Sequence, residues 1–346
     1  MENVVKQCVG IDVSKDTIDC CIGAIDSNQQ MKFGKSKKFE NDKKGFDDLL
    51  TWVEGQRKSP NLDFVMEATG VYYENLAYFL DSQNLKLSVV LPSMVKYFAK
   101  SINVKTKTDS KDAEVLSQLG LERKLNYWSV PTKLMRQIKL LCREYREIKA
   151  KIVVAKNQLH AKKRCFGNTE SIEKRLNQQL TLLENHSAEI EKEIKELTMT
   201  DPEFYVKVER ICTLPGVQFM TVISILAETN AFALVKNVKQ VVSYAGMDIQ
   251  HNQSGIKEGK TRISKKGNSF IRNALYMPAL SASKHNDALS LFYNQLKDRK
   301  PAKKIAVTAV ARKLLILIYV LWKNNAKYEP DYEKNRQTEA CLHGMS

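Results

Sequence analysis

The hydrophobic pattern of residues 1–130 predicts an α/β domain in which strands and helices alternate. Apolar runs predict three strands at the start and two more in "DFVMEATG" and "LKLSVVLP". Segments with helical periodicity lie between these later strands and after them. Three strands followed by alternating helices and strands predict a mixed sheet with helices on its faces. The first predicted strands span 4–13, 17–25 and 31–39, and the predicted helices span 45–55, 73–82 and two segments between 92 and 123.

A different pattern, over residues 131–200, predicts two long helices that form a coiled-coil hairpin. Apolar positions alternate steps of four and three along both arms, which is a heptad seam. In "CFGNTES", Gly167 and Asn168 are suited to a helix end and Thr169 to the next helix cap. The hairpin could join two chains or pack only on itself. The seam residues are Leu134, Ile138, Leu141, Tyr145, Ile148, Ile152, Ala155 and Leu159, then Leu176, Leu180, Leu183, Ser187, Ile190, Ile194 and Leu197.

Residues 201–327 predict a third, mainly α-helical domain. It opens with "ICTLPGVQFMTVISILAE", in which a Pro-Gly turn joins two apolar helices and resembles a helix-hairpin-helix. Backbone amides of such a turn can bind a DNA phosphate. The apolar run 314–322 is shorter than the roughly 20 residues of a membrane span, so it predicts a buried helix and no membrane partner. The polar tail 328–346 is expected to be loose.

Charge and cysteine content narrow the possible partners. The 346 residues include 55 Lys and Arg against 39 Asp and Glu, a formal net charge of +16. This charge indicates a polyanionic partner, nucleic acid before an anionic membrane surface, or simply a soluble basic protein. The 7 cysteines form no CxxC pair and the 5 histidines lack ligand spacing. These features argue against a zinc site and fit a reducing cytoplasm.

Four carboxylates of the first domain are candidates for chemistry. Asp12 lies inside an apolar strand, and Glu67 ends the apolar strand "FVME". Asp109 and Asp112 are three residues apart at a predicted helix start, so their side chains share one face. Burial of an isolated carboxylate is costly unless it is paired, hydrogen-bonded or metal-bound. Each acid except Asp12 could equally be an ordinary solvated charge.

Divalent cations would offset both the burial and the mutual repulsion of these acids. Hard oxygen ligands favour Mg²⁺ or Mn²⁺. Two such ions about 3.5–4 Å apart can clamp the attacking and leaving oxygens of phosphoryl transfer. A strand acid, a strand-end acid and a helical acid pair fit a ribonuclease-H-like fold. Whether the four side chains converge stays open at this point.

The second stretch with candidate chemistry is 243–272, where glycines and short polar residues predict a loop that leads into a helix near Asn268. Its cations and amides are suited to phosphate contact. Ser254, beside Gly255, is a candidate nucleophile that cations or a metal would have to activate. A plain turn serine is the alternative. The expected nucleic-acid-binding residues are Lys257, Lys260, Arg262, Lys265, Lys266, Asn268 and Arg272.

Together these stretches resemble the DEDD transposases of the IS110 insertion-sequence family. The matching segments, in family order over about residues 9–280, are "GIDVSKDT", "MEATGVYYENLA", "VKTKTDSKDAEVL", "LPGV", "YAGM", "QSG" and "RISKKGNSFIR". Each segment alone is weak, and their order makes the resemblance specific. Two positions depart from the family pattern. Gln218 follows "LPGV" where Gly is frequent, and Gln253 precedes Ser254 where many relatives have a second Ser.

The resemblance implies a RuvC-like domain over 1–130, a coiled-coil linker over 131–200 and a transposase domain over 201–327. It implies a recombinase with one composite site from both domains, completed in a dimer or tetramer. It further implies a structured non-coding RNA that selects element ends and target DNA, in a bacterial or archaeal cytoplasm near the nucleoid. The implied catalytic residues are Asp12, Glu67, Asp109 and Asp112, which bind Mg²⁺, and Ser254, which joins covalently to DNA.

Two other functions stay open on the residues alone. A metal-dependent, structure-specific nuclease such as a junction resolvase would use water as the nucleophile, and Ser254 would then be incidental. A non-enzymatic nucleic-acid-binding dimer would carry a degenerate acid site. Strand cleavage and exchange is the function that the resemblance favours.

Overall fold

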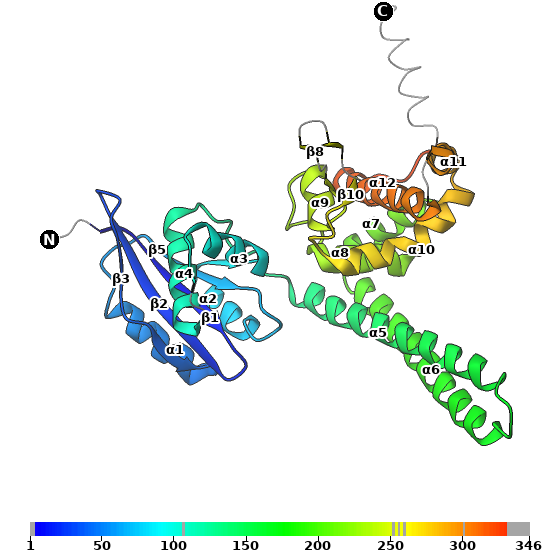
Figure 1. Ribbon diagram of the computed structural model, residues 1–346, viewed down its shortest axis with the longest axis horizontal. Coiled ribbons are helices and arrows are strands. Elements are labelled where there is room, and N and C mark those ends of the chain that lie inside the picture. Colours follow the sequence, from blue (N-terminus) through cyan, green and yellow to red (C-terminus); the bar gives the residue numbers. More distant parts are fainter. Residues whose placement is uncertain are drawn as a thin grey trace, which may run out of the picture. The chain divides into compact units, whose positions relative to one another are not determined.

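The computed structural model describes residues 4–105, 108–250, 253–254, 257–258, 261–299 and 302–330. Contacts divide the chain into two units, Met1–Val130 and Pro131–Ser346 (Figure 1). The first unit combines a sheet with helices, and the second is mostly helical, as the hydrophobic pattern predicts. Each unit is described separately below.

A six-stranded sheet organises the first unit, in the order β3-β2-β1-β5-β6, with β4 also paired to β2. β1 is antiparallel to β2 and parallel to β5, which is parallel to β6. A tight turn joins β1 to β2, where the Ser14 amide donates to the Thr17 carbonyl oxygen at 2.9 Å. The strands are β1 Val4–Val13, β2 Thr17–Asp26, β3 Met31–Phe33, β4 Lys37–Glu40, β5 Leu62–Glu67 and β6 Lys86–Val90.

The single strand expected over 31–39 is in fact two strands, β3 and β4. Both pair with β2, β3 near Gly23 and β4 near Ile18. Between them the Gly34 amide donates to the Ile22 carbonyl oxygen at 2.9 Å. The chain therefore leaves the ladder at Gly34 and rejoins the same edge of β2 further along.

Helices cover both faces of this sheet. α1 and α2 pack on the face that contains Ile11 and Val13 of β1. α3 and α4 pack on the opposite face, which contains Cys8. Because successive strand residues point to opposite faces, Gly10 and Asp12 belong to the α4 face. The helices are α1 Lys43–Glu54, α2 Glu74–Ser82, α3 Pro92–Ser101 and α4 Asp109–Glu122.

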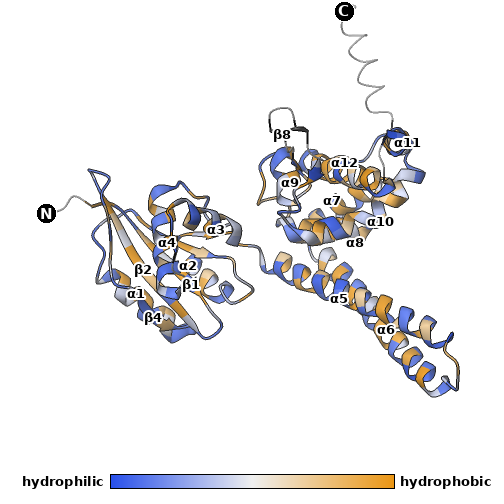
Figure 2. Ribbon diagram, in the orientation of Figure 1, coloured by the Kyte–Doolittle hydropathy of each residue, from blue (hydrophilic) through white to orange (hydrophobic). Residues whose placement is uncertain are grey.

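The second unit begins with a hairpin of two long helices, α5 Lys133–Lys162 and α6 Glu170–Met199, which pack along each other (Figure 1). Both helices mix hydrophobic and hydrophilic residues along their length (Figure 2). Seam positions such as Ile138, Ile152 and Ile194 are buried. The heptad pattern therefore marks the buried faces of both helices.

The connection between the two arms differs in one detail from its prediction. Thr169 occupies the cap position of α6, but its side chain makes no capping hydrogen bond. Its hydroxyl donates to Glu173 Oε1 at 2.7 Å. The side chain of Asn168 instead accepts from the amide of Glu170 at 3.0 Å, so the neighbouring residue supplies the cap.

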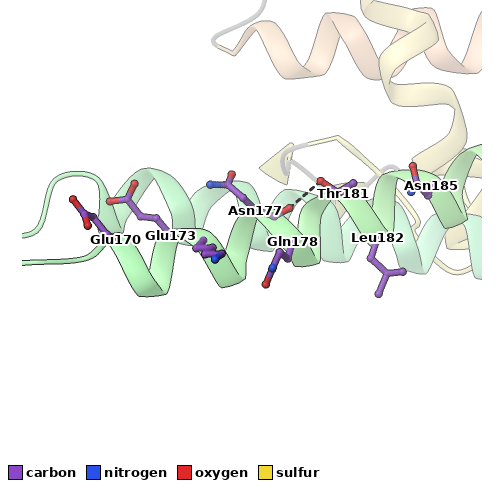
Figure 3. A pocket seen from close by; sticks show the side chains of 8 residues that line it. Glu170, Glu173, Asn177, Gln178, Thr181, Leu182 and Asn185 are labelled. Carbon is purple, nitrogen blue, oxygen red and sulfur yellow. Dashed lines mark hydrogen bonds between the residues drawn. The ribbon is translucent and has the colours of Figure 1, made fainter.

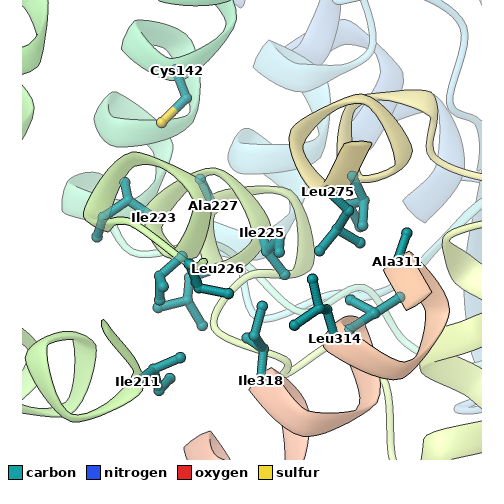
Figure 4. Close-up of a cluster of buried hydrophobic side chains, with 14 of the residues drawn as sticks. Cys142, Ile211, Ile223, Ile225, Leu226, Ala227, Leu275, Ala311, Leu314 and Ile318 are labelled. Atoms are coloured by element: carbon teal, nitrogen blue, oxygen red, sulfur yellow. The ribbon is translucent and has the colours of Figure 1, made fainter. Parts of the chain in front are cut away.

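In the described part of the second unit, helices α7 to α12 enclose the hydrophobic core. Buried side chains of α7, α8, α10 and α12 meet there, together with Cys142 of α5 (Figure 4). The Pro-Gly turn joins α7 to α8 as the sequence predicts. The helices are α7 Pro202–Cys212, α8 Phe219–Thr229, α9 Val238–Tyr244, α10 Ser269–His285, α11 Asp287–Arg299 and α12 Lys303–Asn324.

The apolar run 314–322 lies in α12, which is longer than that run. By length and composition alone α12 could cross a membrane, and half of its most apolar window is buried inside the unit. Leu314, Leu315 and Ile318 are fully buried. The predicted buried helix is therefore present, with part of its surface in the core.

The end of the described chain is better anchored than the sequence predicts. Tyr328, where the tail was expected to loosen, donates its amide to Thr213 Oγ1 at 3.0 Å. Its hydroxyl accepts from Asn286 Nδ2 at 3.0 Å. The remainder of the expected tail, 331–346, lies outside the described residues.

Candidate functional site

The first candidate site lies where β1 and β5 end side by side. Their parallel register pairs Ile11 with Met66, so Asp12 and Glu67 each follow the last paired residue of neighbouring strands. Ile11 and Val13 are buried on the opposite face of the sheet. Asp12 itself is half-buried on the α4 face. The alternation of the strand thus removes the apparent conflict of an acid between two apolar residues.

Helix α4 brings the two remaining acids to this face because it packs directly on β1. A Cβ added to Gly10 would collide with the backbone of Ala113 and Ser117. Ser117 Oγ also donates to the carbonyl oxygen of Cys8 at 2.8 Å. The first turn of α4, with Asp109 and Asp112, therefore lies close to the end of β1.

Helix capping and charge stabilise this first turn. Thr108 accepts a hydrogen bond from the Lys111 amide at 3.3 Å. Asp109 and Asp112 both lie in the first turn, where the positive end of the helix dipole favours negative charge. Asp109 is exposed and Asp112 is half-buried.

Electrostatics tie the four acids together at Asp12. Burial, as the largest cause, and the negative charges of the neighbouring acids together raise the pKa of the Asp12 carboxyl to about 6; these acids are Asp112, Asp109, Glu67 and Asp19. Among the residues that the structure describes, none forms a hydrogen bond or an ion pair with the Asp12 side chain. Asp12 is thus a half-buried acid surrounded by like charges, with no cation of the described chain to neutralise it.

Sequence reasoning missed the fifth acid, Asp19. It pairs directly with Asp12 across the β1–β2 ladder, and it is buried. Lys38 of β4 neutralises it, with Nζ 3.2 Å from Asp19 Oδ2. The signal was present in the sequence, because the short turn after Val13 sets the register of β1 against β2.

The donor chemistry of this acid cluster fits a divalent cation. Carboxylate oxygens are the ligands that Mg²⁺ and Mn²⁺ prefer. Within the described part of the chain, no three His, Cys, Asp or Glu side chains are close enough together to hold an ion. Glu67 Oε1 accepts instead from Thr69 Oγ1 at 2.7 Å. The acids are gathered by the fold, but their side chains do not form a closed ligand shell.

The second candidate site lies in the stretch 243–272, and it contains short strands where the sequence predicts a loop. β7 Ile249–Gln250 pairs with β10 Arg262–Ile263, and β8 Gln253–Ser254 pairs with β9 Lys257–Glu258. The backbone register places Ser254 opposite Lys257. Gly255 and Lys260 lie outside the described residues.

Three of the expected nucleic-acid-binding residues, Arg262, Lys265 and Lys266, are exposed. Two others bind the protein itself. Arg272 Nη1 donates to the carbonyl oxygens of Ala245 at 2.8 Å and of Gly267 at 2.9 Å. The guanidinium thus holds the backbone at Ala245 and Gly267 together, so Arg272 has a structural role.

Asn268 also has an internal task. Its side-chain oxygen caps α10 by accepting from the amides of Phe270 and Ile271, at 2.8 and 3.2 Å. Its amide nitrogen donates to Glu228 Oε2 at 2.8 Å. The start of α10 is therefore fixed to α8 by Asn268.

Glu228 is a buried acid that sequence reasoning also missed. It is 3% exposed. Arg143 of α5 donates to both of its carboxylate oxygens, at 2.8 and 3.1 Å. Burial alone would raise the pKa of Glu228, but the hydrogen bonds from Arg143 and Asn268 and the charge of Lys139 outweigh it and lower the pKa. This network joins α5, α8 and the start of α10.

The Pro-Gly turn before α8 packs tightly against α10. Gly216 has a φ of +88°, and a Cβ at this position would lie 2.7 Å from the amide nitrogen of Ala282. Gln218 begins α8 without a capping hydrogen bond from its side chain. Glycine is therefore required at 216 both by its φ and by the close approach of α10.

Hollows on the described part of the second unit include a strip along one helix and a groove between three helices. One is a shallow strip along α6, lined by polar side chains such as Asn177 and Asn185 and by the exposed Leu182 (Figure 3). Thr181 Oγ1 in this strip donates to the Asn177 carbonyl oxygen at 3.1 Å. Its polar groups do not converge on one point, so we assign it no chemistry. The other is a groove between α5, α8 and α10.

Two family models of transposases match this chain, one mainly in its N-terminal half and one in its C-terminal half. A model of IS110-type DEDD transposases, described as "Transposase", matches residues 9–162. A model described as "Transposase IS116/IS110/IS902 family" matches residues 208–294. The first match contains Asp12, Glu67, Asp109 and Asp112, and the second contains Ser254.

Curated relatives agree with these matches. The pilin gene-inverting protein of Moraxella bovis is 26% identical over 327 residues, which cover 94% of this chain and 98% of the relative. Its namesake from Moraxella lacunata has the same identity and coverage. The transposase for insertion sequence element IS1111A of Coxiella burnetii is 27% identical over 124 residues, which cover 35% of this chain and 34% of the relative.

Proposed function

Because the chain belongs to the IS116/IS110/IS902 family of transposases, we propose that this DNA transposase cleaves and exchanges strands with Ser254 as its nucleophile. The acids Asp12, Glu67, Asp109 and Asp112 would hold Mg²⁺ or Mn²⁺, with two ions per site. Such ions polarise a scissile phosphate and stabilise the charge that develops on it.

One observation carries the metal part of this proposal, namely the unneutralised charge at Asp12. The carboxyl is half-buried, its burial and the charges of four other carboxylates together raise its pKa to about 6, and no described side chain pairs with it. Folding tolerates such repulsion at functional sites when an external cation is to be bound. Asp109, which is exposed, and Asp112, which is half-buried, would approach the ions by rotation of their side chains.

The basic stretch supports the nucleic-acid part of the proposal. Arg262, Lys265 and Lys266 are exposed next to the strands that carry Ser254, and exposed cations of this kind bind phosphate oxygens. Attack by the Ser254 hydroxyl would form a serine–phosphate ester as the DNA chain breaks and one DNA end leaves as a hydroxyl. Glu228, Asn268 and Arg272 would hold this stretch on the helical core.

Further parts of the proposal rest on the family. The strand order, three antiparallel strands followed by parallel ones, supports a RuvC-like first domain. The long α5–α6 hairpin supports a coiled coil through which a dimer or tetramer forms. A structured guide RNA, element ends and target DNA would be the partners, in the cytoplasm. The pilin gene-inverting relatives suggest that the exchange can invert a segment.

The Ser254→Ala variant tests the nucleophile. The full-length protein is incubated with Mg²⁺ and a DNA duplex that carries the ends of its element, and covalent protein–DNA adducts are separated on a denaturing gel. We expect the parent to form the adduct and Ser254→Ala to form none, while its DNA affinity stays within about twofold. An adduct that persists in Ser254→Ala excludes this serine as the nucleophile.

Comparison of cleavage by Asp12→Asn and by Ser254→Ala separates a serine recombinase from a nuclease that uses water. Both mechanisms need Asp12, so cleavage is lost in either case. Only the recombinase also loses cleavage in Ser254→Ala. Continued cleavage by Ser254→Ala together with inactive Asp12→Asn would therefore favour the junction-resolvase alternative.

A further inference from the structure

A groove of about 720 Å³ lies between α5, α8 and α10 in the second unit. Its volume is in the range of pockets that bind small organic groups. Arg146 and Lys149 line it from α5, Gln218 from the start of α8, and Phe270 and Met277 from α10. The groove thus lies next to the start of α10, which Asn268 caps.

Arg146 is the distinctive residue of this groove. Its guanidinium lies 3.8 Å from the centroid of the Phe270 ring. Its Nη1 atom is buried and has no hydrogen-bond partner in the described part of the chain. A buried cationic donor without an acceptor is rare in folded proteins, because it is costly to desolvate. An acceptor that enters from the groove would relieve this cost.

The neighbouring arginine on the same helix, by contrast, has an anionic partner. Arg143 stacks on the same ring, at 4.5 Å from its centroid. Its guanidinium is paired with both carboxylate oxygens of Glu228. The fold therefore neutralises one cation on Phe270 and leaves the other, one helical turn further along α5, without an anion among the described residues.

Other groups in the groove also suit an anion. Lys149 is exposed beside Arg146, with its Nζ 5.0 Å from the centroid of the Tyr145 ring. The first turn of α8 starts at the groove, and the Gln218 side chain does not cap it. The amides of this turn are donors that can reach a phosphate oxygen.

We propose that this groove binds one phosphate of an unpaired nucleic acid strand, with Arg146 and Lys149 as its charged contacts. This inference rests on the proposed function, because that function supplies the nucleic acid. The groove is enclosed by three helices, so a single nucleotide enters it more readily than the rigid edge of a duplex. Met220 and Met277 offer adaptable apolar contact to the attached base.

Binding of labelled oligonucleotides to full-length protein tests the proposal. The probes are fluorescein-labelled 20-mers of thymidylate and uridylate and a 20-base-pair DNA duplex, followed by fluorescence anisotropy over a range of KCl. We expect Arg146→Gln and Lys149→Gln each to weaken binding of the single strands by about tenfold. The slope of log affinity against log salt should fall by about 1.

Lys151→Gln is the matched control, because Lys151 is also exposed on α5 but does not line the groove. It removes the same charge and should change single-strand affinity by less than about twofold. Equal losses in the control and the groove variants would overturn the proposal, as would unchanged affinity in both groove variants. Lys149→Gln keeps the test valid if Arg146→Gln unfolds, since the Lys149 side chain is exposed.

The three probes also identify the source of the phosphate. A loss for thymidylate alone points to DNA, a loss for uridylate alone points to RNA, and a loss for both means that the shared backbone is recognised. A larger loss for the duplex than for either single strand would overturn the assignment to an unpaired nucleotide. A parent that binds none of the probes would overturn both this inference and the proposed function.

A photo-crosslink locates the contact independently of affinity. Benzoylphenylalanine is introduced at Met277, which is 67% exposed and lines the groove, or at Leu291, which is 64% exposed on α11 outside it. We expect the thymidylate or uridylate probe to crosslink at 277 and not at 291. Equal crosslinking at both positions, or none at 277 while the probe is bound, contradicts binding in the groove.

Discussion

Two buried or half-buried acids, Asp12 in the first unit and Glu228 in the second, are treated in opposite ways by the fold. Glu228 is 3% exposed and is neutralised by Arg143, with Asn268 as a further donor. Asp12 faces four carboxylates and pairs with no described cation. Their pKa values accordingly shift in opposite directions, down for Glu228 and up for Asp12.

This difference distinguishes an acid that stabilises the fold from one that fits the proposed role of a cation ligand. A buried carboxylate with a complete set of donors needs nothing from outside the chain. A carboxylate that is surrounded by like charge gains stability only when an external cation binds. The comparison indicates a structural role for Glu228 and supports the proposed cation-binding role of Asp12, so substitutions at the two positions should have opposite effects on stability.

The largest effect is expected for Glu228→Ala. It leaves Arg143 and Asn268 without their shared acceptor, and the loss of one partner of a buried pair typically costs 3–5 kcal/mol. Because Arg143 is 35% exposed, we expect a value near the lower limit, about 3 kcal/mol. Urea denaturation followed by circular dichroism measures the free energy of unfolding.

Glu184→Ala is the control for this substitution. Glu184 is also paired with a cation, Lys156 at 2.8 Å, but both side chains are exposed. Its loss should cost less than about 0.5 kcal/mol. Replacement of both Glu228 and Arg143 by Leu should recover part of the stability, since the carboxylate and the guanidinium paired with it are removed together and only the more distant Lys139 charge remains. A Glu228→Ala variant as stable as Glu184→Ala would remove the distinction between the two acids.

A smaller and opposite effect is expected for Asp12→Asn in the absence of metal. The amide removes one of five mutually repelling charges, so the protein should become more stable by on the order of 1 kcal/mol, after allowance for solvent screening at a half-buried site. Thermal melting measures the change. Addition of Mn²⁺ should raise the melting temperature of the parent and leave that of Asp12→Asn nearly unchanged.

Asp16→Asn is the matched control, because Asp16 is exposed in the turn just beyond β1. It removes the same formal charge, but Asp16 is not among the acids that raise the pKa of Asp12, so its melting temperature with and without Mn²⁺ should follow the parent. A destabilised Asp12→Asn variant would mean that Asp12 has a stabilising partner, and it would then resemble Glu228.

The sequence predicts most of the fold because the signals are local. Apolar runs predict β1 and β2, and helical periodicity predicts α1 through α6 to within a few residues. The break at Gly34, which divides 31–39 into β3 and β4, depends on where the chain can pair with β2. No local pattern carries that information. The same limit applies to Thr169, whose hydroxyl takes Glu173 as partner and leaves the cap to Asn168.

The candidate site, too, can be predicted from the sequence only in part. Asp12 and Glu67 can be selected from sequence because each is an acid in or after an apolar strand. Their proximity follows from the parallel register of β1 and β5. The approach of α4 depends on Gly10, whose sequence context gives no sign of it. Glu228 ends an apolar helix and carries a similar local signal to Glu67, but its partner Arg143 is 85 residues away.

The smallest expected effect is the pH dependence of stability in Asp12→Asn and in Glu228→Gln. The sign of this dependence distinguishes the two acids. The folded pKa of Asp12, about 6, exceeds its reference value of 3.8. The stability that the protonated carboxyl contributes to the folded state is therefore fully present below pH 3.8 and is lost as pH rises through 6. The stabilisation by Asp12→Asn should therefore vanish at acidic pH and reach its full size above 6.

For Glu228 the signs reverse. Its folded pKa is below the reference value of 4.5, so its contribution is present above 4.5 and is lost as pH falls through the lowered value. The destabilisation in Glu228→Gln should therefore be constant from about pH 7 to pH 5 and shrink only at more acidic pH. Melting curves of both variants and the parent across this range measure the two trends. Parallel trends for Asp12→Asn and Glu228→Gln would mean that both acids are neutralised within the chain, and the case for an external cation at Asp12 would fall.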